Sequence, residues 1–430
     1  MQNVKGAFCI KCGSEFDAGK EIYTCTECGG ILDIEYNYAY IKKQASRDKF
    51  AANKDFSMWR YIAFLPVEQD ARLCPLRTGW SPLYKTDTLA KALGLKNLYV
   101  KDDGINPTAS LKDRPSAIAV TRALSVGKST VACSSTGNAA SSLAGAAASV
   151  GLKSVIFVPE RAPKGKLTQL LIFGATVVSV KGDYGAAFRL SAQAIENYGW
   201  YNRNAAINPY LSEGKKTVSL EIAEQLGLAS DRFVAPDFVA VSVGDGCTIA
   251  GVWKGFKDLY TVGLIEKLPR LISVQAEGCC PVNRAVENKA HIEPMDENTI
   301  ADSIAVGVPR NGDKALEAIR ESNGIAINVS DDEILETMRL LGRTSGIFGE
   351  PAGAAGTAGL AKAVKKQLVP RDALVVSIVT GNGLKDVASA QKAAGISGDA
   401  ATDNSDESKL IHIEPDMDLL INELTKRGIS

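Results

Sequence analysis

The chain has 430 residues, 45% of them hydrophobic and 23% charged, which suits a globular protein with a large core and two or three domains. It carries 49 basic and 49 acidic side chains, so its net charge of zero gives no electrostatic reason to expect nucleic acid or an anionic membrane as a partner. No apolar run approaches the roughly 20 residues of a membrane span, and residues 1–6 carry no hydrophobic signal segment, so we expect no membrane partner and a cytoplasmic location.

Histidine and cysteine usage narrows the chemistry further. The only histidines, His291 and His412, stand beside neither a nucleophile nor a glycine turn, so we interpret them as surface or packing residues. Acid–base chemistry is therefore expected from lysine, carboxylates, tyrosine or a cofactor. Nine cysteines in a chain of this length do not indicate a disulfide framework, and they fit a reducing compartment.

Two Cys-x-x-Cys turns in residues 1–35 predict a small separate module. Cys9 and Cys12 make the first turn, Cys25 and Cys28 make the second, and a glycine follows each turn. Such turns, joined by a short strand-rich loop, bring four thiolates to one tetrahedral point, so we predict a zinc-ribbon-like module with a structural zinc ion. The alternative is four free cysteines in a metal-free remnant. The module has more acidic than basic residues, which disfavours nucleic-acid binding.

Strands and helices alternate from about residue 75 to residue 390. Short β-branched runs predict strands at 97–101, 129–133, 154–158, 176–180, 238–243, 271–275 and 374–379. Helical stretches, such as 115–126 and 139–150, lie between most of them. This alternation indicates an α/β fold of mostly parallel sheets flanked by helices. Its length favours two lobes with the ligand in the cleft between them.

The C-terminal segment has a different composition. Residues 395–408 are small, polar and acidic, which predicts a flexible linker. Beyond it, in residues 409–430, apolar Leu419, Leu420, Ile421 and Leu424 recur at helical spacing. We expect a C-terminal helix that packs on the body or on a partner subunit.

Three glycine-containing turns each follow a predicted strand, at the edge where α/β folds bind ligands. They are Ser135-Thr136-Gly137-Asn138, Gly244-Asp245-Gly246-Cys247-Thr248 and the turn that begins at Thr380. The first two open helices, whose free N–H groups and positive dipole suit a carboxylate or a phosphate. Alternatively, Asn138 is only a helix cap and the glycines of the second turn only serve its geometry. The third turn indicates only that polar groups meet at another strand end.

A lysine lies just before another predicted helix. The segment Asn106-Pro-Thr-Ala-Ser110-Leu-Lys112-Asp-Arg114 leads into a helix begun by Pro115. A lysine at the positive end of a helix, if it is also buried, favours the neutral and nucleophilic amine. The alternative is an ordinary surface lysine.

Taken in this order, these motifs resemble the threonine synthases, which are fold-type-II pyridoxal-phosphate enzymes of the tryptophan synthase β superfamily. The resemblance spans about Gly79 to Ala390, and its supporting segments are 208–217, 299–304 and 346–351. It implies a two-lobed catalytic body over residues 36–390, with the smaller lobe at roughly 115–205 and the larger lobe formed by the remainder. It also implies a homodimer that acts on a small amino acid.

The resemblance implies a role for each motif residue. Lys112 would bind the cofactor covalently and then act as general base and acid. Asn138 would bond the ring hydroxyl oxygen, Thr380 would face the pyridine nitrogen, and residues 244–248 would bind the cofactor phosphate. The substrate would be held by Ser110, Ser135, Thr136 and Gly137.

The reaction implied by the resemblance converts O-phosphohomoserine and water to threonine and phosphate. The alternatives are another β- or γ-eliminating or replacing enzyme, such as a serine/threonine dehydratase or a cysteate-synthase-like enzyme, and a non-catalytic sensor or scaffold. Many threonine synthases carry a basic residue where this chain has Leu211. Arg203, Lys215 and Lys216 are the candidates for supplying that charge. The chain also has Ala109 and Leu111 in place of the more usual glycine and phenylalanine.

Overall fold

The largest sheet organises one half of the body. The structure, a computed structural model, describes residues 1–17, 21–162, 164–205, 207–230, 232–396, 411 and 413–429. The six strands of this sheet run in the order β12 (Ile325–Val329), β11 (Arg270–Ala276), β10 (Phe238–Ser242), β13 (Leu374–Val379), β5 (Asn97–Asp102) and β4 (Leu83–Lys85). Only the edge strand β4 is antiparallel to its neighbour. Every residue of β10 is buried, as expected for a central strand covered on both faces.

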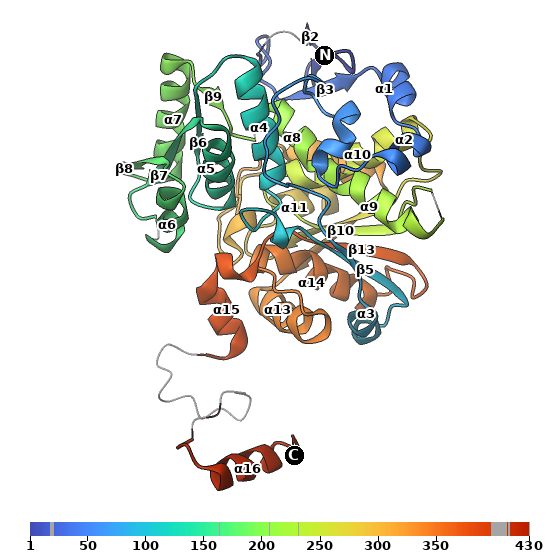
Figure 1. Ribbon diagram of the computed structural model, residues 1–430, viewed down its shortest axis with the longest axis vertical. Coiled ribbons are helices and arrows are strands. Elements are labelled where there is room, and N and C mark those ends of the chain that lie inside the picture. The colour runs from blue at the N-terminus through green and yellow to red at the C-terminus, as the bar shows by residue number, and fades with distance from the viewer. Residues whose placement is uncertain are drawn as a thin grey trace.

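Helices cover both faces of this sheet. One face packs against α3 (Asp87–Leu93), α13 (Asp331–Ser345) and α14 (Pro351–Lys365), with α15 (Val387–Ala394) alongside α13. The other face packs against α10 (Cys247–Thr261), α11 (Pro281–Glu287) and α12 (Gly312–Glu321). Beyond α10 lie α8 (Pro209–Lys215) and α9 (Thr217–Gly227) (Figure 1). The short 3-10 segments are η2 (Asp103–Ile105), η3 (Leu228–Ser230), η4 (Asp302–Ile304) and η5 (Gly383–Lys385).

A second, smaller sheet is fully parallel. Its strands run in the order β8 (Thr176–Val180), β7 (Lys153–Pro159), β6 (Thr130–Ser134) and β9 (Tyr201–Asn202). Around it pack α4 (Asp113–Ser125), α5 (Asn138–Val150), α6 (Lys164–Ile172) and α7 (Tyr184–Tyr198). Helix α4 also packs closely on α8, so it joins the small sheet to the larger one.

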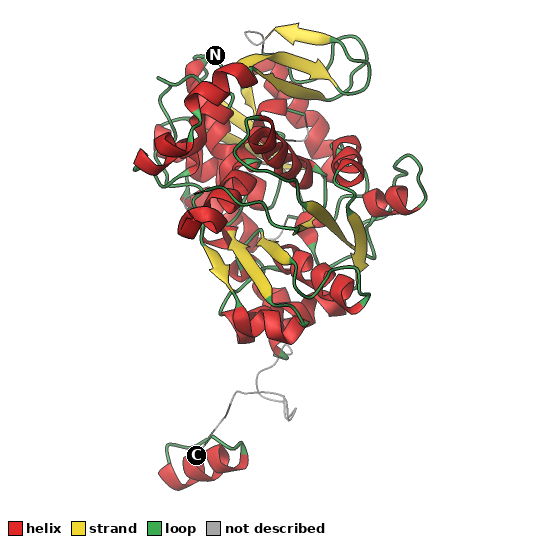
Figure 2. Cartoon of the chain, turned by 90° about the vertical axis from the view of Figure 1, so that its right-hand side faces the viewer, coloured by secondary structure: helices red, strands yellow, loops and turns green. Residues whose placement is uncertain are grey.

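The N-terminal residues form a small antiparallel sheet of their own. It consists of β1 (Val4–Cys9), β2 (Glu15–Asp17) and β3 (Leu32–Tyr36) in the order β2-β1-β3 (Figure 2). Strand β3 packs on α8, and α1 (Tyr38–Gln44), α2 (Arg47–Ala52) and η1 (Met58–Phe64) lead from it along the body. The buried side chains of this sheet belong to the same apolar core as α4, α9 and α10.

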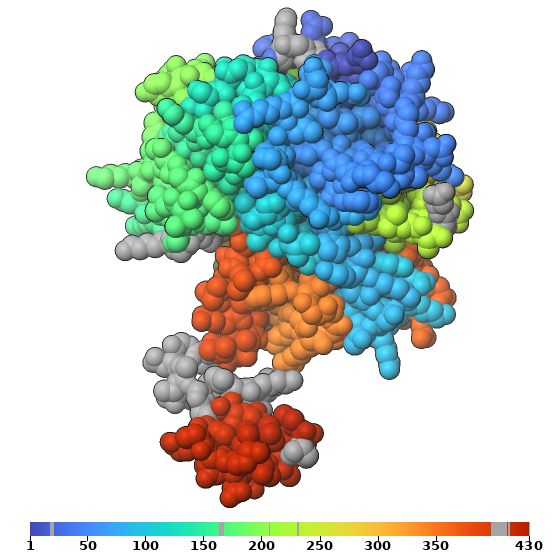
Figure 3. Space-filling model, viewed as in Figure 1, coloured from blue at the N-terminus to red at the C-terminus, as the bar shows by residue number. Residues whose placement is uncertain are grey.

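The prediction of an α/β fold of mostly parallel sheets flanked by helices is confirmed, and the structure adds three strands to it. All seven expected strands are present within one or two residues, whereas β4, β9 and β12 were not expected. Helix α16 (Met417–Lys426) forms within the expected segment, but it buries none of its residues and stands apart from the body (Figure 3). The expected linker lies outside the described residues, except for 395 and 396. Among the described helices, none is long and apolar enough to cross a membrane.

Candidate active site

The three glycine turns lie at the carboxyl ends of β6, β10 and β13. Strand β6 ends at Ser134 and α5 begins at Asn138, while β10 ends at Ser242 and α10 begins at Cys247. Thr380 follows β13 directly. Since parallel strands end at one edge of a sheet, each turn presents its backbone groups where such folds bind ligands.

Lys112 is held by the turn after β13. The backbone N–H of Leu111 donates to the Thr380 carbonyl at 2.8 Å, and Ser110 forms an isolated antiparallel bridge with Gly381. Ala109 adopts φ +67°, a left-handed conformation that usually favours glycine. Lys112 is the residue immediately before α4, so its amine stands at the positive end of that helix dipole. Lys112 and Thr380 therefore lie on two loops that are distant in the sequence but are hydrogen-bonded to each other.

Burial and neighbouring cations favour the neutral form of Lys112. Burial is the largest cause, followed by the charge of Lys215, and together with Arg203 they lower the pKa of Lys112 to about 8. Cys247 and Glu350 act in the opposite direction. An amine with this pKa is partly unprotonated near neutral pH, which is the state required of a nucleophile that binds a carbonyl carbon.

The turn after β10 forms a cradle without side chains at its base. A Cβ atom on Gly244 would lie 2.8 Å from the Cα atom of Ile304, and one on Gly246 would lie 2.5 Å from the Asn311 carbonyl oxygen. Gly246 also adopts φ +90°. Beyond it, Cys247 and Thr248 form the first turn of α10, whose N–H groups have no partner within the helix. A tight glycine turn at a helix N-terminus suits a phosphate group.

A cavity of about 410 Å³ lies beside the turn after β6. Its lining includes Thr136, Gly137 and Asn138 from this turn, together with Glu350 and Lys385. The Asn138 side-chain amide donates to Glu350 at 2.7 Å, and burial raises the pKa of Glu350 to about 7. A glutamic acid with this pKa exchanges a proton near neutral pH.

Ser135 shapes the turn rather than the cavity wall. Its hydroxyl accepts a hydrogen bond from the Gly137 N–H at 3.2 Å. Glu350 lies in the segment 346–351 and Lys385 in the turn that begins at Thr380, but neither residue was predicted to have a role. The only signal was their place inside those two motifs.

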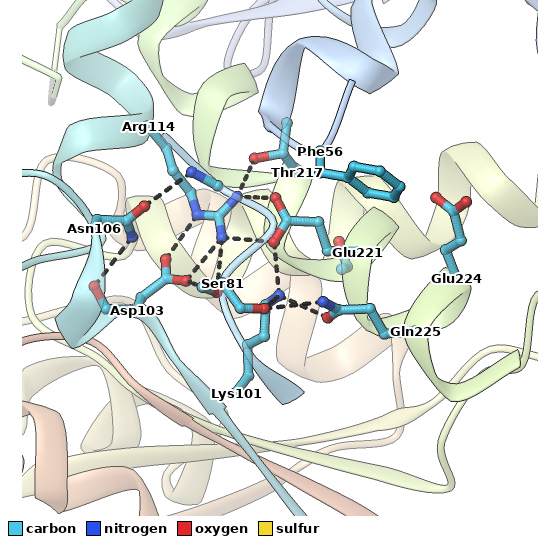
Figure 4. A network of polar contacts seen from close by, with 12 residues as sticks. Phe56, Ser81, Lys101, Asp103, Asn106, Arg114, Thr217, Glu221, Glu224 and Gln225 are labelled. Carbon is cyan, nitrogen blue, oxygen red and sulfur yellow. Dashed lines mark hydrogen bonds and ion pairs between the residues drawn. The ribbon is translucent and has the colours of Figure 1, made fainter. Parts of the chain in front are cut away.

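A buried network of charges fixes the segment that carries Lys112 (Figure 4). The Arg114 guanidinium, fully buried, pairs with Asp103 at 2.7 Å and with Glu221. Lys101 pairs with the same Glu221 at 2.6 Å. Although burial opposes it, these two cations lower the pKa of Glu221 to about 2. The network, which we call the Arg114 network, ties α4 to β5 and α9 and thereby fixes the start of α4.

The four N-terminal cysteines converge as expected from their spacing. The Sγ atoms of Cys9 and Cys28 are 3.5 Å apart, and those of Cys12 and Cys25 are 3.6 Å apart. All four ligand atoms lie within 4.8 Å of one another. A tetrahedral zinc ion with Zn–S bonds of about 2.3 Å needs sulfurs about 3.8 Å apart, so this donor set fits zinc. Gly30 is required beside the cluster, because a Cβ there would lie 2.8 Å from the Cys9 sulfur.

Comparisons with known proteins give the family. The model of the family described as "Pyridoxal-phosphate dependent enzyme" matches residues 75–381. Threonine synthase of Methanocaldococcus jannaschii is 41% identical over 415 residues, which cover 96% of this chain and 97% of that protein. Threonine synthase of Methanosarcina acetivorans is 42% identical, over 88% of this chain and 91% of that protein.

Solved structures agree on the fold. Diaminopropionate ammonia lyase from Escherichia coli superposes with a TM-score of 0.64 at 21% identity, covering 79% of this chain and 93% of that chain. Threonine deaminase isoform 2 from Solanum lycopersicum superposes with a TM-score of 0.62 at 22% identity, covering 74% of this chain and 88% of that chain. The chain therefore belongs to the pyridoxal-phosphate-dependent enzymes of fold type II, and within them to the threonine synthase family.

Proposed function

We propose that this protein is a pyridoxal-phosphate-dependent threonine synthase, which converts O-phosphohomoserine and water to threonine and phosphate. The observation that carries the proposal is Lys112, anchored to the turn of Thr380 at the positive end of α4 with its pKa lowered to about 8. The identity of 41% with a threonine synthase over nearly the whole chain favours this reaction over a dehydratase or a non-catalytic sensor.

The residues present fit the cofactor. The glycine cradle at residues 244–248 would hold its phosphate, with N–H groups at the start of α10 as donors. Asn138 would bond its ring hydroxyl oxygen, and Thr380 would face its ring nitrogen. When bound, the cofactor supplies an electron sink for negative charge at the substrate carbon.

Lys112 and the loop after β6 would serve the substrate. Ser135, Thr136 and Gly137, with Ser110, would orient the α-carboxylate beside the cavity. Lys112, once released from its covalent link, would take a proton from the substrate and return it, as general base and then acid. No histidine takes part in this scheme, and His291 is exposed, while His412 lies outside the described residues.

Further features of the molecule belong to the same proposal. Residues 1–35 form a module whose four cysteines bind a structural zinc ion, and residues 115–205 form the smaller lobe of a body that extends over 36–390. We infer that the enzyme is a homodimer and works in the cytoplasm, as the family resemblance and the cysteine usage support.

An assay of both products tests the function. Purified protein with pyridoxal phosphate is given O-phosphohomoserine, and phosphate and threonine are measured together. Equal amounts of the two products are expected, and none with Lys112→Ala. Cofactor absorbance without either product would contradict the proposed substrate and indicate a different amino acid.

A further inference from the structure

Two buried cations beside Lys112 have no carboxylate partner among the residues that the structure describes. Lys215 and Arg203 are each only 2% exposed. Within the described part of the chain, Lys215 makes no side-chain hydrogen bond or ion pair. In the same described residues, the Arg203 guanidinium donates to the hydroxyls of Ser116 and Ser142 and to the Lys112 carbonyl oxygen, and to no carboxylate. Burying a cation without an anion is costly, so this arrangement requires an anionic ligand.

The next lysine along the chain is a natural comparison. Lys216 is fully buried too, but it pairs with Glu213 at 2.8 Å and with Asp258 at 2.7 Å. Its charge is therefore neutralised within the fold. Of the three basic residues near the position of Leu211, only Lys215 and Arg203 are left for a ligand.

Helix packing places Lys215 beside the glycine cradle. Helix α8 packs on α10 at Gly251, where an added Cβ would lie 3.1 Å from the Lys215 Cβ. Gly251 is one turn from Cys247, the first residue of α10. The charge of Lys215 lowers the pKa of Cys247, of Asp245 and of Lys112, although burial is the larger influence on each.

The neighbouring acid does not neutralise this pair. The Asp245 carboxylate accepts hydrogen bonds from the Arg310 backbone N–H at 2.8 Å and from the Cys247 thiol at 3.3 Å. It lies beyond ion-pairing distance of both cations, and burial raises its pKa. The local field at the start of α10 is therefore positive, with the helix dipole adding to the two side chains.

We propose that Lys215, assisted by Arg203, binds a phosphate monoester dianion at the first turn of α10. Two such groups enter the site under the proposed function, on which this inference rests: the phosphate that leaves the substrate and the phosphate of the cofactor. An ammonium group and a guanidinium group are the side chains that suit a phosphate best. Where the bound group is the substrate phosphate, Lys215 supplies the charge that is absent at Leu211.

The test is a neutral variant read in two separate binding measurements. Lys215→Met is compared with wild type and with Lys314→Met, which replaces a buried lysine that pairs with Asp33 of β3 at 2.9 Å. In the holoenzyme, KM for O-phosphohomoserine and Ki for inorganic phosphate are measured. In the apoprotein, the Kd of pyridoxal phosphate is measured against that of pyridoxal, which lacks the phosphate.

Loss of a charge-assisted hydrogen bond should raise the KM, Ki or Kd of the phosphate that Lys215 binds by about ten- to a hundredfold. A rise in KM and Ki alone assigns Lys215 to the substrate phosphate, and a rise in the pyridoxal phosphate Kd alone assigns it to the cofactor phosphate. Both changes together mean that it serves both phosphates. Lys215→Arg should restore most of the loss, and Lys215→Gln replaces the methionine variant if that one does not fold.

Unchanged constants in Lys215→Met would overturn the inference. If wild type releases no phosphate from O-phosphohomoserine, the proposed function fails instead, and the pyridoxal phosphate measurement still decides the role of Lys215. In Lys314→Met all of these constants should stay within about twofold of wild type, because that side chain serves the N-terminal module.

Discussion

Two clusters of buried charge lie along the first turn of α4, and they differ in one respect. In the Arg114 network, two cations and two carboxylates neutralise one another (Figure 4). In the cluster of Lys112, Lys215 and Arg203, which we call the open cluster, no cation has a carboxylate of the described residues within ion-pairing distance. Lys112 and Arg114 are only two residues apart, so the difference comes from the neighbouring elements and not from α4 itself.

The comparison teaches how to separate structural charges from functional ones. A buried charge that is paired inside the fold is a structural feature, and removing its partner destabilises the protein. A buried charge without a partner in the fold indicates a site where a ligand of opposite charge binds. The four cysteines of the N-terminal module resemble the open cluster, since their sulfur atoms, which are all metal ligands, lie close together around one point.

Removing Lys112 should have the largest effect on activity. In Lys112→Ala, turnover should fall about 10⁴-fold or more, because the general base and the covalent attachment of the cofactor are lost together. The visible absorbance of the bound cofactor should disappear with it. Lys91→Ala, an exposed lysine on α3, is the control and should keep both signals. Full activity in Lys112→Ala would disprove the assignment.

Breaking the Arg114 network should have the largest effect on stability. Arg114→Met leaves Asp103 buried without a cation and Glu221 with only Lys101. The free energy of unfolding should fall by about 3–5 kcal/mol in chemical denaturation. The matched control is Lys5→Ala, which removes an exposed ion pair with Glu35 and should cost less than about 1 kcal/mol. Equal losses in the two variants would contradict the distinction.

Emptying the cysteine cluster should remove zinc without changing the chemistry. Wild type should contain about one zinc ion per chain by elemental analysis, and Cys9→Ser with Cys12→Ser should contain none. The double variant should be less stable, because the module shares its core with the body. Its kcat should change by less than about threefold, since closed four-cysteine sites are structural. Cys74→Ala, a buried cysteine outside the cluster, should retain the metal.

The open cluster should make the stability of the apoprotein depend on pH. Lys112 has a pKa of about 8 when folded against 10.5 ordinarily, so between these values the unfolded chain binds a proton that the folded chain does not. The free energy of unfolding should therefore rise with pH across that window, by at most about 1.4 kcal/mol per pH unit. Below pH 8 Lys112 is protonated in the folded chain too, so the full cost of burying its charge is present there.

Lys215→Met tests whether a neighbouring charge contributes to this pH dependence. Loss of a neighbouring positive charge should raise the pKa of Lys112, which narrows the window and makes the apoprotein more stable at neutral pH. Chemical denaturation of the apoprotein from pH 7 to pH 11 measures both effects. Lys112→Met provides the baseline without this titration. A pH profile of wild type that matches that baseline would count against the burial of the Lys112 charge.

The smallest expected effect is at Ala109. Its left-handed backbone costs about 1 kcal/mol relative to glycine, but glycine also gains entropy in the unfolded chain. Ala109→Gly should therefore change the free energy of unfolding by less than about 1 kcal/mol. It leaves both charge clusters intact, so turnover should persist. A loss comparable with that of Arg114→Met would show that this turn, and not the Arg114 network, fixes Lys112.

Much of the fold could be predicted because its signals are local. Central strands such as β10 are buried throughout and apolar except for a serine, and each glycine turn follows such a run, so strand, turn and helix could be placed from neighbouring residues. Strand β12 was missed although Ile325, Ile327 and Val329 alternate with smaller or polar residues. It is an outer strand whose pattern is half-buried, and five residues of alternation are a weak signal.

Seven strands of the catalytic body, the glycine turns, the four-cysteine spacing and Lys112 could be identified from the sequence, since each depends on residues close together in the chain. Only the tertiary structure brought Glu350 to Asn138 and separated the roles of two adjacent lysines. Successive residues of a helix point about 100° apart, so Lys216 pairs with Glu213 and Asp258 while Lys215 packs against Gly251 of α10. Which carboxylates stand opposite a lysine is decided by helices that are distant in sequence, and no local pattern encodes it.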